Sequence, residues 1–172
     1  AAPAGLPQPG PGDSYDLQGL IFDGGGAGGP GWDLNGVDEF YARVHLRNYG
    51  GHGIHLRGGS RRVRLQPTVE NVGGHGVWLD GDVAESQFLA TMISGTGSDA
   101  LRLSGAGVRY NALRLPGVFT QSVLGLLERS GGYGLRIEDG ATFNQVHPGT
   151  VRHNPSGGII VTGTGTQHNV IG

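Results

Sequence analysis

Four side chains capable of acid–base chemistry recur at regular intervals along the chain. They are His52, His75, Asp99 and Tyr133, separated by steps of 23, 24 and 34 residues. If the chain coils with this period, the four side chains stack along one edge of the coil at strand spacing. Histidine, carboxylate and phenol together can supply a base and an acid for proton abstraction beside a uronate carboxylate. These four residues are the candidate catalytic residues.

The same column permits two other interpretations. Two histidines and one aspartate can hold a divalent metal, so an ion such as Ca²⁺ stays an open alternative. Polar side chains beside glycine are also common in turns, and the residue types favour this structural role over catalysis or metal binding. We therefore predict neither a cofactor nor a bound metal.

A second set of candidates occupies the outward positions of the predicted core strands. It consists of His55, Trp78, Arg102 and Arg136, followed in the column by Ile160. Tryptophan can stack on a pyranose ring, and arginine can pair with a sugar carboxylate, so the first four are candidate ligand-binding residues. Exposed aromatic and arginine side chains suit a contact with a neighbouring subunit equally well. Both interpretations stay open.

Both columns depend on an internal repeat. Five segments share a turn of small residues followed by an alternating strand: GHGIHLRGG (51–59), GHGVWLDGD (74–82), SDALRLSGA (98–106), GYGLRIEDG (132–140) and SGGIIVTGT (156–164). Their first core positions are 23, 24, 34 and 24 residues apart, and an apolar residue eight positions earlier repeats with the same steps. A third column contains Ser86, Asn111, Asn144 and Asn169. An insertion at about residues 115–126 accounts for the long step.

Each repeat alternates between apolar and polar residues, which indicates strands and not helices. The sequence predicts an all-β fold, a single-stranded right-handed parallel β-helix of about six rungs with about 24 residues per rung. We divide the chain into a flexible Pro/Gly-rich arm, residues 1–14, and a β-helix domain, residues 15–172. The last four residues begin a rung, so we expect that the chain continues or that another subunit covers the open strand edges.

Composition excludes several classes of function. All 12 basic residues are arginine and the net charge is −2, which argues against an electrostatic nucleic-acid binder. The chain has no cysteine, so it has no disulfide and no thiolate site. No apolar run approaches the roughly 20 residues that span a bilayer, so we expect no membrane insertion. The 36 glycines indicate many tight turns.

The pattern G-x-G-h-x-h-x-G, where h is apolar, occurs at residues 51–58 and 74–81. It resembles the parallel β-helix repeats of the pectin-lyase-like superfamily, which includes polysaccharide lyases, glycoside hydrolases, alginate epimerases and bacteriophage tailspikes. The resemblance covers residues 15–172 and implies a polysaccharide ligand and an extracellular or virion-surface location. Its tailspike branch also implies a homotrimer. The Asp-Pro-His motif of alginate epimerases is absent, since the comparable stretch is YGGHGIH (49–55).

Two functions of different classes follow as hypotheses. The first is a tailspike-like structural or adhesion module that recognises cell-envelope or extracellular polysaccharide. The alternative is an enzyme of the same superfamily, a polysaccharide lyase, C5-epimerase or glycoside hydrolase. The short stack of rungs and the lack of a convergent catalytic set favour the binding module. Whether the chain is an enzyme stays open.

Overall fold

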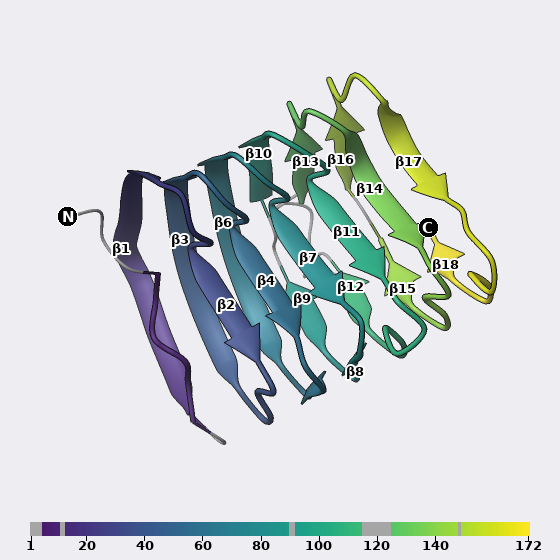
Figure 1. The fold of residues 1–172 in the computed structure, drawn as a ribbon, viewed down its shortest axis with the longest axis horizontal. Coiled ribbons are helices and arrows are strands. Elements are labelled where there is room, and N and C mark those ends of the chain that lie inside the picture. Colours follow the sequence, from purple (N-terminus) through teal and green to yellow (C-terminus); the bar gives the residue numbers. More distant parts are fainter. Residues whose placement is uncertain (1–4, 11–12, 90–91, 115–124, 148) are drawn as a thin grey trace.

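The computed structural model describes residues 5–10, 13–89, 92–114, 125–147 and 149–172. Within these residues the chain is all-β and contains no helix. Parallel strands coil into a β-solenoid of about six turns with a spacing of about 24 residues, which confirms the predicted fold class. The turns lie side by side, with the N-terminal strand at one end and the C-terminal strands at the other (Figure 1).

Each turn contributes strands to two long sheets. The six-stranded sheet contains β2 (Trp32–Asn35), β4 (Ile54–Arg57), β7 (Val77–Asp80), β11 (Leu101–Ser104), β14 (Tyr133–Glu138) and β17 (Gly157–Val161). The ten-stranded sheet contains β1 (Ser14–Ala27), β3 (Tyr41–Tyr49), β6 (Arg64–Val72), β9 (Gln87–Leu89), β10 (Met92–Thr96), β12 (Ala112–Arg114), β13 (Leu126–Glu128), β15 (Gln145–Val146), β16 (Thr150–Arg152) and β18 (Val170–Ile171). A small third sheet pairs β5 (Ser60–Arg61) with β8 (Val83–Ala84).

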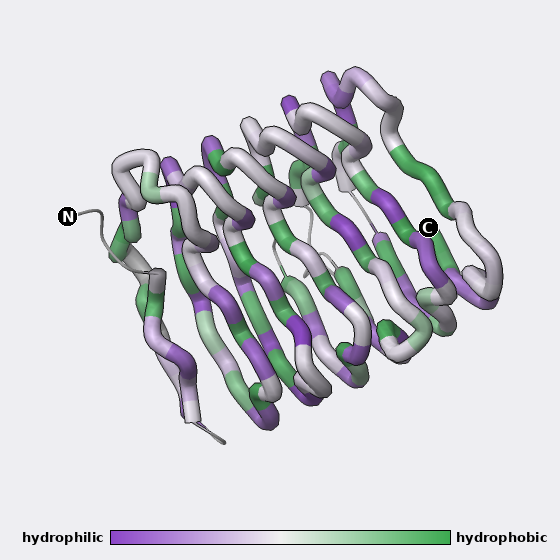
Figure 2. The backbone as a smooth tube through the Cα atoms, in the orientation of Figure 1, coloured by the Kyte–Doolittle hydropathy of each residue, from purple (hydrophilic) through white to green (hydrophobic). Residues whose placement is uncertain are grey.

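The predicted core columns pair in register from turn to turn. The first core positions are neighbours in the six-stranded sheet: Ile54, Val77, Leu101, Leu135 and Ile159. The positions eight residues earlier are neighbours in the ten-stranded sheet: Leu46, Val69, Ile93, Leu127 and Val151. Before the last turn, all of these side chains are buried. Figure 2 shows the alternation of hydrophobic and hydrophilic residues along the strands that places them inward.

Glycine is required where adjacent turns approach each other most closely. A Cβ atom on Gly53 would lie 2.3 Å from Val69 Cγ1 and 2.5 Å from the carbonyl oxygen of Gly76. A Cβ atom on Gly76 would lie 2.2 Å from Ile93 Cγ2. Contacts this short are sterically excluded, so the second glycine of the G-x-G pattern is a packing requirement.

The third predicted column forms a buried asparagine ladder. The Asn111 N–H donates to Asn144 Oδ1 at 3.2 Å, and the Asn144 N–H donates to Asn169 Oδ1 at 3.1 Å. Asn144 Nδ2 also donates to the carbonyl oxygen of Val108, in the preceding turn, at 2.9 Å. The Ser86 N–H donates in the same way to Asn111 Oδ1. Asn111 and Asn144 thus each accept from a main-chain N–H of the preceding turn and donate to a carbonyl oxygen of that turn.

The described part of the predicted N-terminal arm follows the edge of β2. The Leu6 N–H donates to the carbonyl oxygen of Gly31, and Trp32 Nε1 donates to that of Pro7, both at 2.9 Å. These bonds hold this stretch against the first complete turn. In the predicted insertion, residues 115–124 lie outside the described residues.

At the C-terminal end, inward-facing side chains become accessible. Ile159 and Val161 pair with Leu135 and Ile137 in the core columns, yet they are 42% and 45% exposed. In a solenoid each turn covers the apolar face of the turn before it. Within the described chain, no further turn covers these two side chains.

The asparagine ladder predicts a large effect of one substitution. Asn144→Ala leaves the buried Asn111 N–H without an acceptor and removes one of the two donors to the carbonyl oxygen of Val108, which keeps its bond from the Thr142 N–H. We expect the free energy of unfolding, measured by urea denaturation, to fall by about 1–3 kcal/mol. Asn71→Gly is the control, because Asn71 is exposed and has a positive φ that glycine tolerates. Equal stability of Asn144→Ala and the wild type would contradict a structural ladder.

Candidate functional site

All of the predicted site residues lie on the outward side of the six-stranded sheet. The candidate catalytic residues precede or begin its strands: His52, His75, Asp99 and Tyr133. The candidate ligand-binding residues pair in register across β4, β7, β11 and β14: His55, Trp78, Arg102 and Arg136. We call this surface the outer face. The solenoid repeat therefore brings together residues that are far apart in the sequence.

Neighbouring members of the candidate catalytic column are linked through the main chain. The His75 N–H donates to His52 Nδ1 at 3.0 Å, and the Asp99 N–H donates to His75 Nδ1 at 3.1 Å. The Tyr133 N–H donates to Asp99 Oδ1 at 2.7 Å. The two imidazole rings stack with centroids 5.3 Å apart and planes 6° from parallel. Each side chain therefore supports the next turn, and this geometry favours the structural interpretation of the column.

Burial restricts acid–base chemistry in this column. His75 is 8% exposed and Asp99 is 4% exposed. In addition, His75 Nε2 lies 3.0 Å from Arg102 Nη1. A neutral imidazole has a single lone pair, so the Asp99 amide and the Arg102 guanidinium compete for it. A substrate could use His75 as a base only by displacing one of these two donors.

The surroundings keep both histidines of the column neutral. Burial lowers the pKa of His75 to about 4, and the positive charge of Arg102 adds to this effect while Asp99 opposes it. Burial also lowers the pKa of His52, with a further contribution from His55. Both rings are therefore unprotonated at neutral pH, which leaves each Nδ1 able to accept its main-chain hydrogen bond.

Trp78 is enclosed by its neighbours in the outward column. Its ring stacks on His55 with centroids 4.4 Å apart and planes 9° from parallel, and the Arg102 guanidinium lies 5.2 Å from the ring centroid on the next strand. Its Nε1 donates to Ser104 Oγ at 2.9 Å. Side chains from both adjacent turns therefore pack against the indole. A pyranose ring could stack on it in the predicted manner only after displacing one of them.

Arg102 and Arg136 share one carboxylate. Arg102 Nη2 lies 2.5 Å from Glu138 Oε1, and Arg136 Nε lies 2.6 Å from Glu138 Oε2. The Glu138 side chain is nearly buried, whereas the Arg102 and Arg136 side chains are 25% and 35% exposed. Two guanidinium groups thus face the single carboxylate of Glu138, and the Asp99 carboxylate supplies a second negative charge near Arg136. Arg102 Nε is buried and has no hydrogen-bond acceptor among the described residues.

The opposite end of the outer face is acidic. Arg57 forms two hydrogen bonds to the Asp33 carboxylate, at 2.9 and 2.8 Å, and this pairing lowers the pKa of Asp33. His55 Nε2 lies 3.2 Å from Asp80 Oδ2. Sequence reasoning missed Asp33, Arg57, Asp80 and Glu138. The repeat could have identified them. Asp33 lies in the outward column of His55 and Trp78, and Arg57, Asp80 and Glu138 lie in the next outward column, two residues along each strand.

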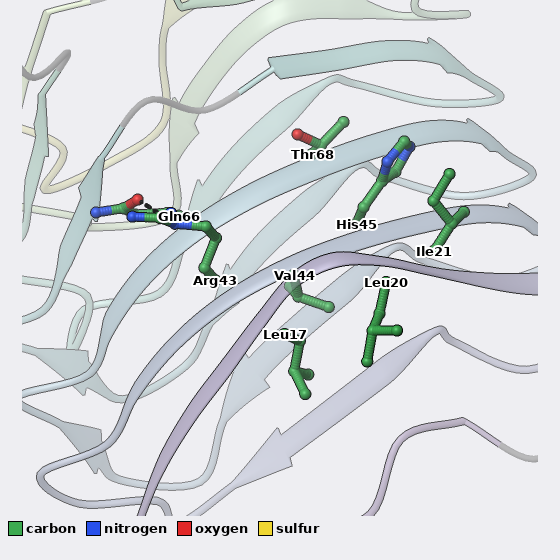
Figure 3. Close-up of a pocket in the computed structure, with 8 residues that line it drawn as sticks. All are labelled: Leu17, Leu20, Ile21, Arg43, Val44, His45, Gln66 and Thr68. Atoms are coloured by element: carbon green, nitrogen blue, oxygen red, sulfur yellow. Dashed lines mark hydrogen bonds between the residues drawn. The ribbon is translucent and has the colours of Figure 1, made fainter.

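A shallow pocket lies elsewhere, where β1 runs beside β3 (Figure 3). It is lined by Leu17, Leu20, Ile21, Arg43, Val44, His45, Gln66 and Thr68. Arg43 Nε donates to Gln66 Oε1 at 2.9 Å, and His45 Nε2 lies 2.9 Å from Glu70 Oε2. Its polar groups are therefore paired within the protein, and no predicted site residue lines it.

The fold defines the class of protein as a parallel β-solenoid. Comparison with known proteins adds no family, because no family model, curated protein or solved structure matches this chain. The resemblance to pectin-lyase-like proteins thus stays a prediction. In the part of the chain that the structure describes, no group of three or more His, Cys, Asp or Glu could hold a metal ion. No helix able to cross a membrane occurs in that part either.

The buried imidazole of His75 predicts a pH-dependent stability. Its pKa, about 4 when folded, lies below the ordinary value of 6.5, so between these values the unfolded chain binds more protons. The free energy of unfolding should therefore fall by up to about 3 kcal/mol as the pH drops from 6.5 to 4. His75→Asn keeps an acceptor for the Asp99 amide and should flatten this dependence in urea denaturation at several pH values. Parallel curves for His75→Asn and the wild type would refute the assignment.

Proposed function

We propose that this β-solenoid is a surface module that recognises extracellular or cell-envelope polysaccharide, and that its outer face binds acidic glycans. The observation that carries the proposal is the pair of guanidinium groups on one buried carboxylate. The pair places two neighbouring guanidinium groups on the sheet, and Glu138 already orders both side chains. A sugar carboxylate or sulfate would accept hydrogen bonds from the exposed parts of these groups.

Arginine suits this role because its planar guanidinium forms paired hydrogen bonds with carboxylate and sulfate oxygens. Arg102 and Arg136 are neighbours in register on β11 and β14, so their guanidinium groups are separated by about one strand spacing. Both guanidinium groups form ion pairs with Glu138. These pairs already order the two side chains, so less conformational entropy is lost when a ligand binds. The acidic end of the same face, around Asp33 and Asp80, would repel the ligand and fix its position.

The enzyme alternative receives less support from the geometry. Nδ1 of His52, Nδ1 of His75 and Oδ1 of Asp99 each accept from a main-chain N–H, and His75 and Asp99 are buried. A general base needs a lone pair within reach of the substrate proton. A polysaccharide lyase, C5-epimerase or glycoside hydrolase activity remains a hypothesis that product analysis decides.

A tailspike-like homotrimer at the extracellular or virion surface is the assembly that accompanies this proposal. Its support is the solenoid architecture, because such rigid repeats form extended surfaces for ligands. Trp78 gives it no further support, since packing within one chain accounts for that side chain. Light scattering tests the assembly: a trimer should give three times the chain mass of 17.8 kDa.

Glycan binding by the arginine pair is tested with immobilised polygalacturonate and, as the neutral reference, dextran. We expect retention on polygalacturonate that weakens with salt, and about a tenfold loss of affinity for Arg102→Gln and for Arg136→Gln. Arg152→Gln, an exposed arginine of the ten-stranded sheet, is the matched control and should bind as the wild type does. Equal binding by all variants would contradict the proposal.

The same incubation separates binding from catalysis. A recognition module leaves the size and saturation of the glycan unchanged. Shortened or unsaturated product would instead establish an enzyme. The candidate catalytic residues would then be His52, His75, Asp99 and Tyr133. In that case His75→Ala and Tyr133→Phe should each abolish turnover.

A further inference from the structure

A second concave surface lies at the corner where the strands of the ten-stranded sheet begin, and we call it the corner pocket. Its polar lining consists of Glu39, Tyr41, Arg62, Arg64, Glu85 and Gln87. These residues come from three successive turns and stack in two columns. Tyr41, Arg64 and Gln87 pair in register on β3, β6 and β9. The pocket therefore extends along the solenoid axis.

Three polar side chains of the corner pocket form no hydrogen bond or ion pair with the described part of the protein. Arg62 pairs with Asp38 and with Glu39, the latter at 3.2 Å. In contrast, the side chains of Arg64, Glu85 and Gln87 form no hydrogen bond or ion pair with the described residues. They offer donors and acceptors to a ligand. The lining contains two arginines and two glutamates, and Asp38 beside Arg62 adds a further negative charge, so the pocket has no excess of positive charge.

An exposed aromatic ladder continues the same corner. The turn position of Glu39, Arg62 and Glu85 is occupied in the next three turns by Tyr110, Phe143 and His168, all with φ of 55–57°. Tyr110 and Phe143 stack with centroids 5.4 Å apart, and Phe143 and His168 stack 4.8 Å apart. Tyr110 is nevertheless 57% exposed and Phe143 is 45% exposed.

Tyr110 is the first ring of the aromatic ladder. It stacks on Phe143 of the following turn. The preceding turn is that of Glu85, which lies beside it, since the Glu85 N–H donates to the carbonyl oxygen of Arg109 at 3.3 Å. A positive φ disfavours a bulky side chain, so backbone geometry gives no reason for an aromatic residue here. The exposed ring of Tyr110 therefore stands one turn beyond the unpaired polar groups.

We propose that the corner pocket binds a neutral saccharide chain that lies along the solenoid axis. The exposed ring of Tyr110 would stack on one sugar ring, and Arg64, Glu85 and Gln87 would bond to the hydroxyl groups of the preceding sugars. Hydroxyl groups both donate and accept, which matches a mixture of guanidinium, carboxylate and amide. Aromatic faces provide apolar contact for the C–H groups of a pyranose ring. This inference rests on the proposed polysaccharide function in one respect only: that function supplies the chemical class of the ligand.

The two surfaces differ in the glycan that they suit. The outer face presents two neighbouring guanidinium groups at Arg102 and Arg136, which suit an acidic glycan. The corner pocket has no excess of positive charge and an accessible aromatic ring beside it, which suits an uncharged glycan. They belong to different sheets, so each can be altered without touching the other.

The test uses the full chain with four linear hexasaccharides: cellohexaose, maltohexaose, mannohexaose and chitohexaose. Saturation-transfer NMR should detect binding of at least one of them. Tyr110→Asn and Arg64→Ala should each weaken that binding about fivefold to tenfold. Asparagine tolerates the φ of 57° at this position, so Tyr110→Asn removes the ring without endangering the fold. Arg152→Ala should have no effect.

The outcomes separate this inference from the proposed function. If Arg136→Gln abolishes polygalacturonate binding but leaves hexasaccharide binding intact, two independent sites are established. Hexasaccharide binding without polygalacturonate binding would support the corner pocket and reject the outer face. Absence of saturation transfer from all four sugars, or unchanged binding in both corner variants, would overturn the inference. Dissociation of an oligomer by Tyr110→Asn would also overturn it, because the ladder would then be a subunit contact.

Discussion

The hydrogen bonding of each turn to the next constrains everything else in this molecule. Parallel strands require equivalent residues of successive turns to lie one strand spacing apart, so each position must tolerate its counterpart as a close neighbour. This explains why Gly53 and Gly76 have no room for a Cβ atom and why the asparagine ladder is buried. A polar side chain inside such a stack is acceptable only when the neighbouring turn supplies its hydrogen-bond partner.

The same constraint governs which outward side chains can meet a ligand. Rings in one column stack on each other, so their faces are covered and mainly their edges reach solvent, as with Trp78 between His55 and Arg102. A stack of rings begins where the residue type of a column changes, and Tyr110, which follows Glu85 in its column, is such a place. The corner pocket thus borders a break in the repeat, whereas Arg102 and Arg136 repeat the same residue on neighbouring strands.

Charge is distributed unevenly along the outer face. The first turns carry Asp33 and Asp80, which Arg57 and His55 only partly balance, whereas the later turns carry Arg102 and Arg136 on the single carboxylate of Glu138. Because the scaffold is rigid, these groups keep fixed positions relative to a bound chain, which favours selectivity for the pattern of charge on a glycan. Neutral and acidic sugars would then use different surfaces of one solenoid.

The sequence alone determined the fold and the neighbours of each residue. Its period specified the register, the core columns and the grouping of His52, His75, Asp99 and Tyr133, because translation by one turn superimposes equivalent residues. Only the tertiary structure decided what the side chains do. It showed that Nδ1 of His52, Nδ1 of His75 and Oδ1 of Asp99 accept main-chain hydrogen bonds, and that Glu138 joins two arginines. The period says which side chains are adjacent, but rotamers, burial and competition for each lone pair are settled by packing in three dimensions.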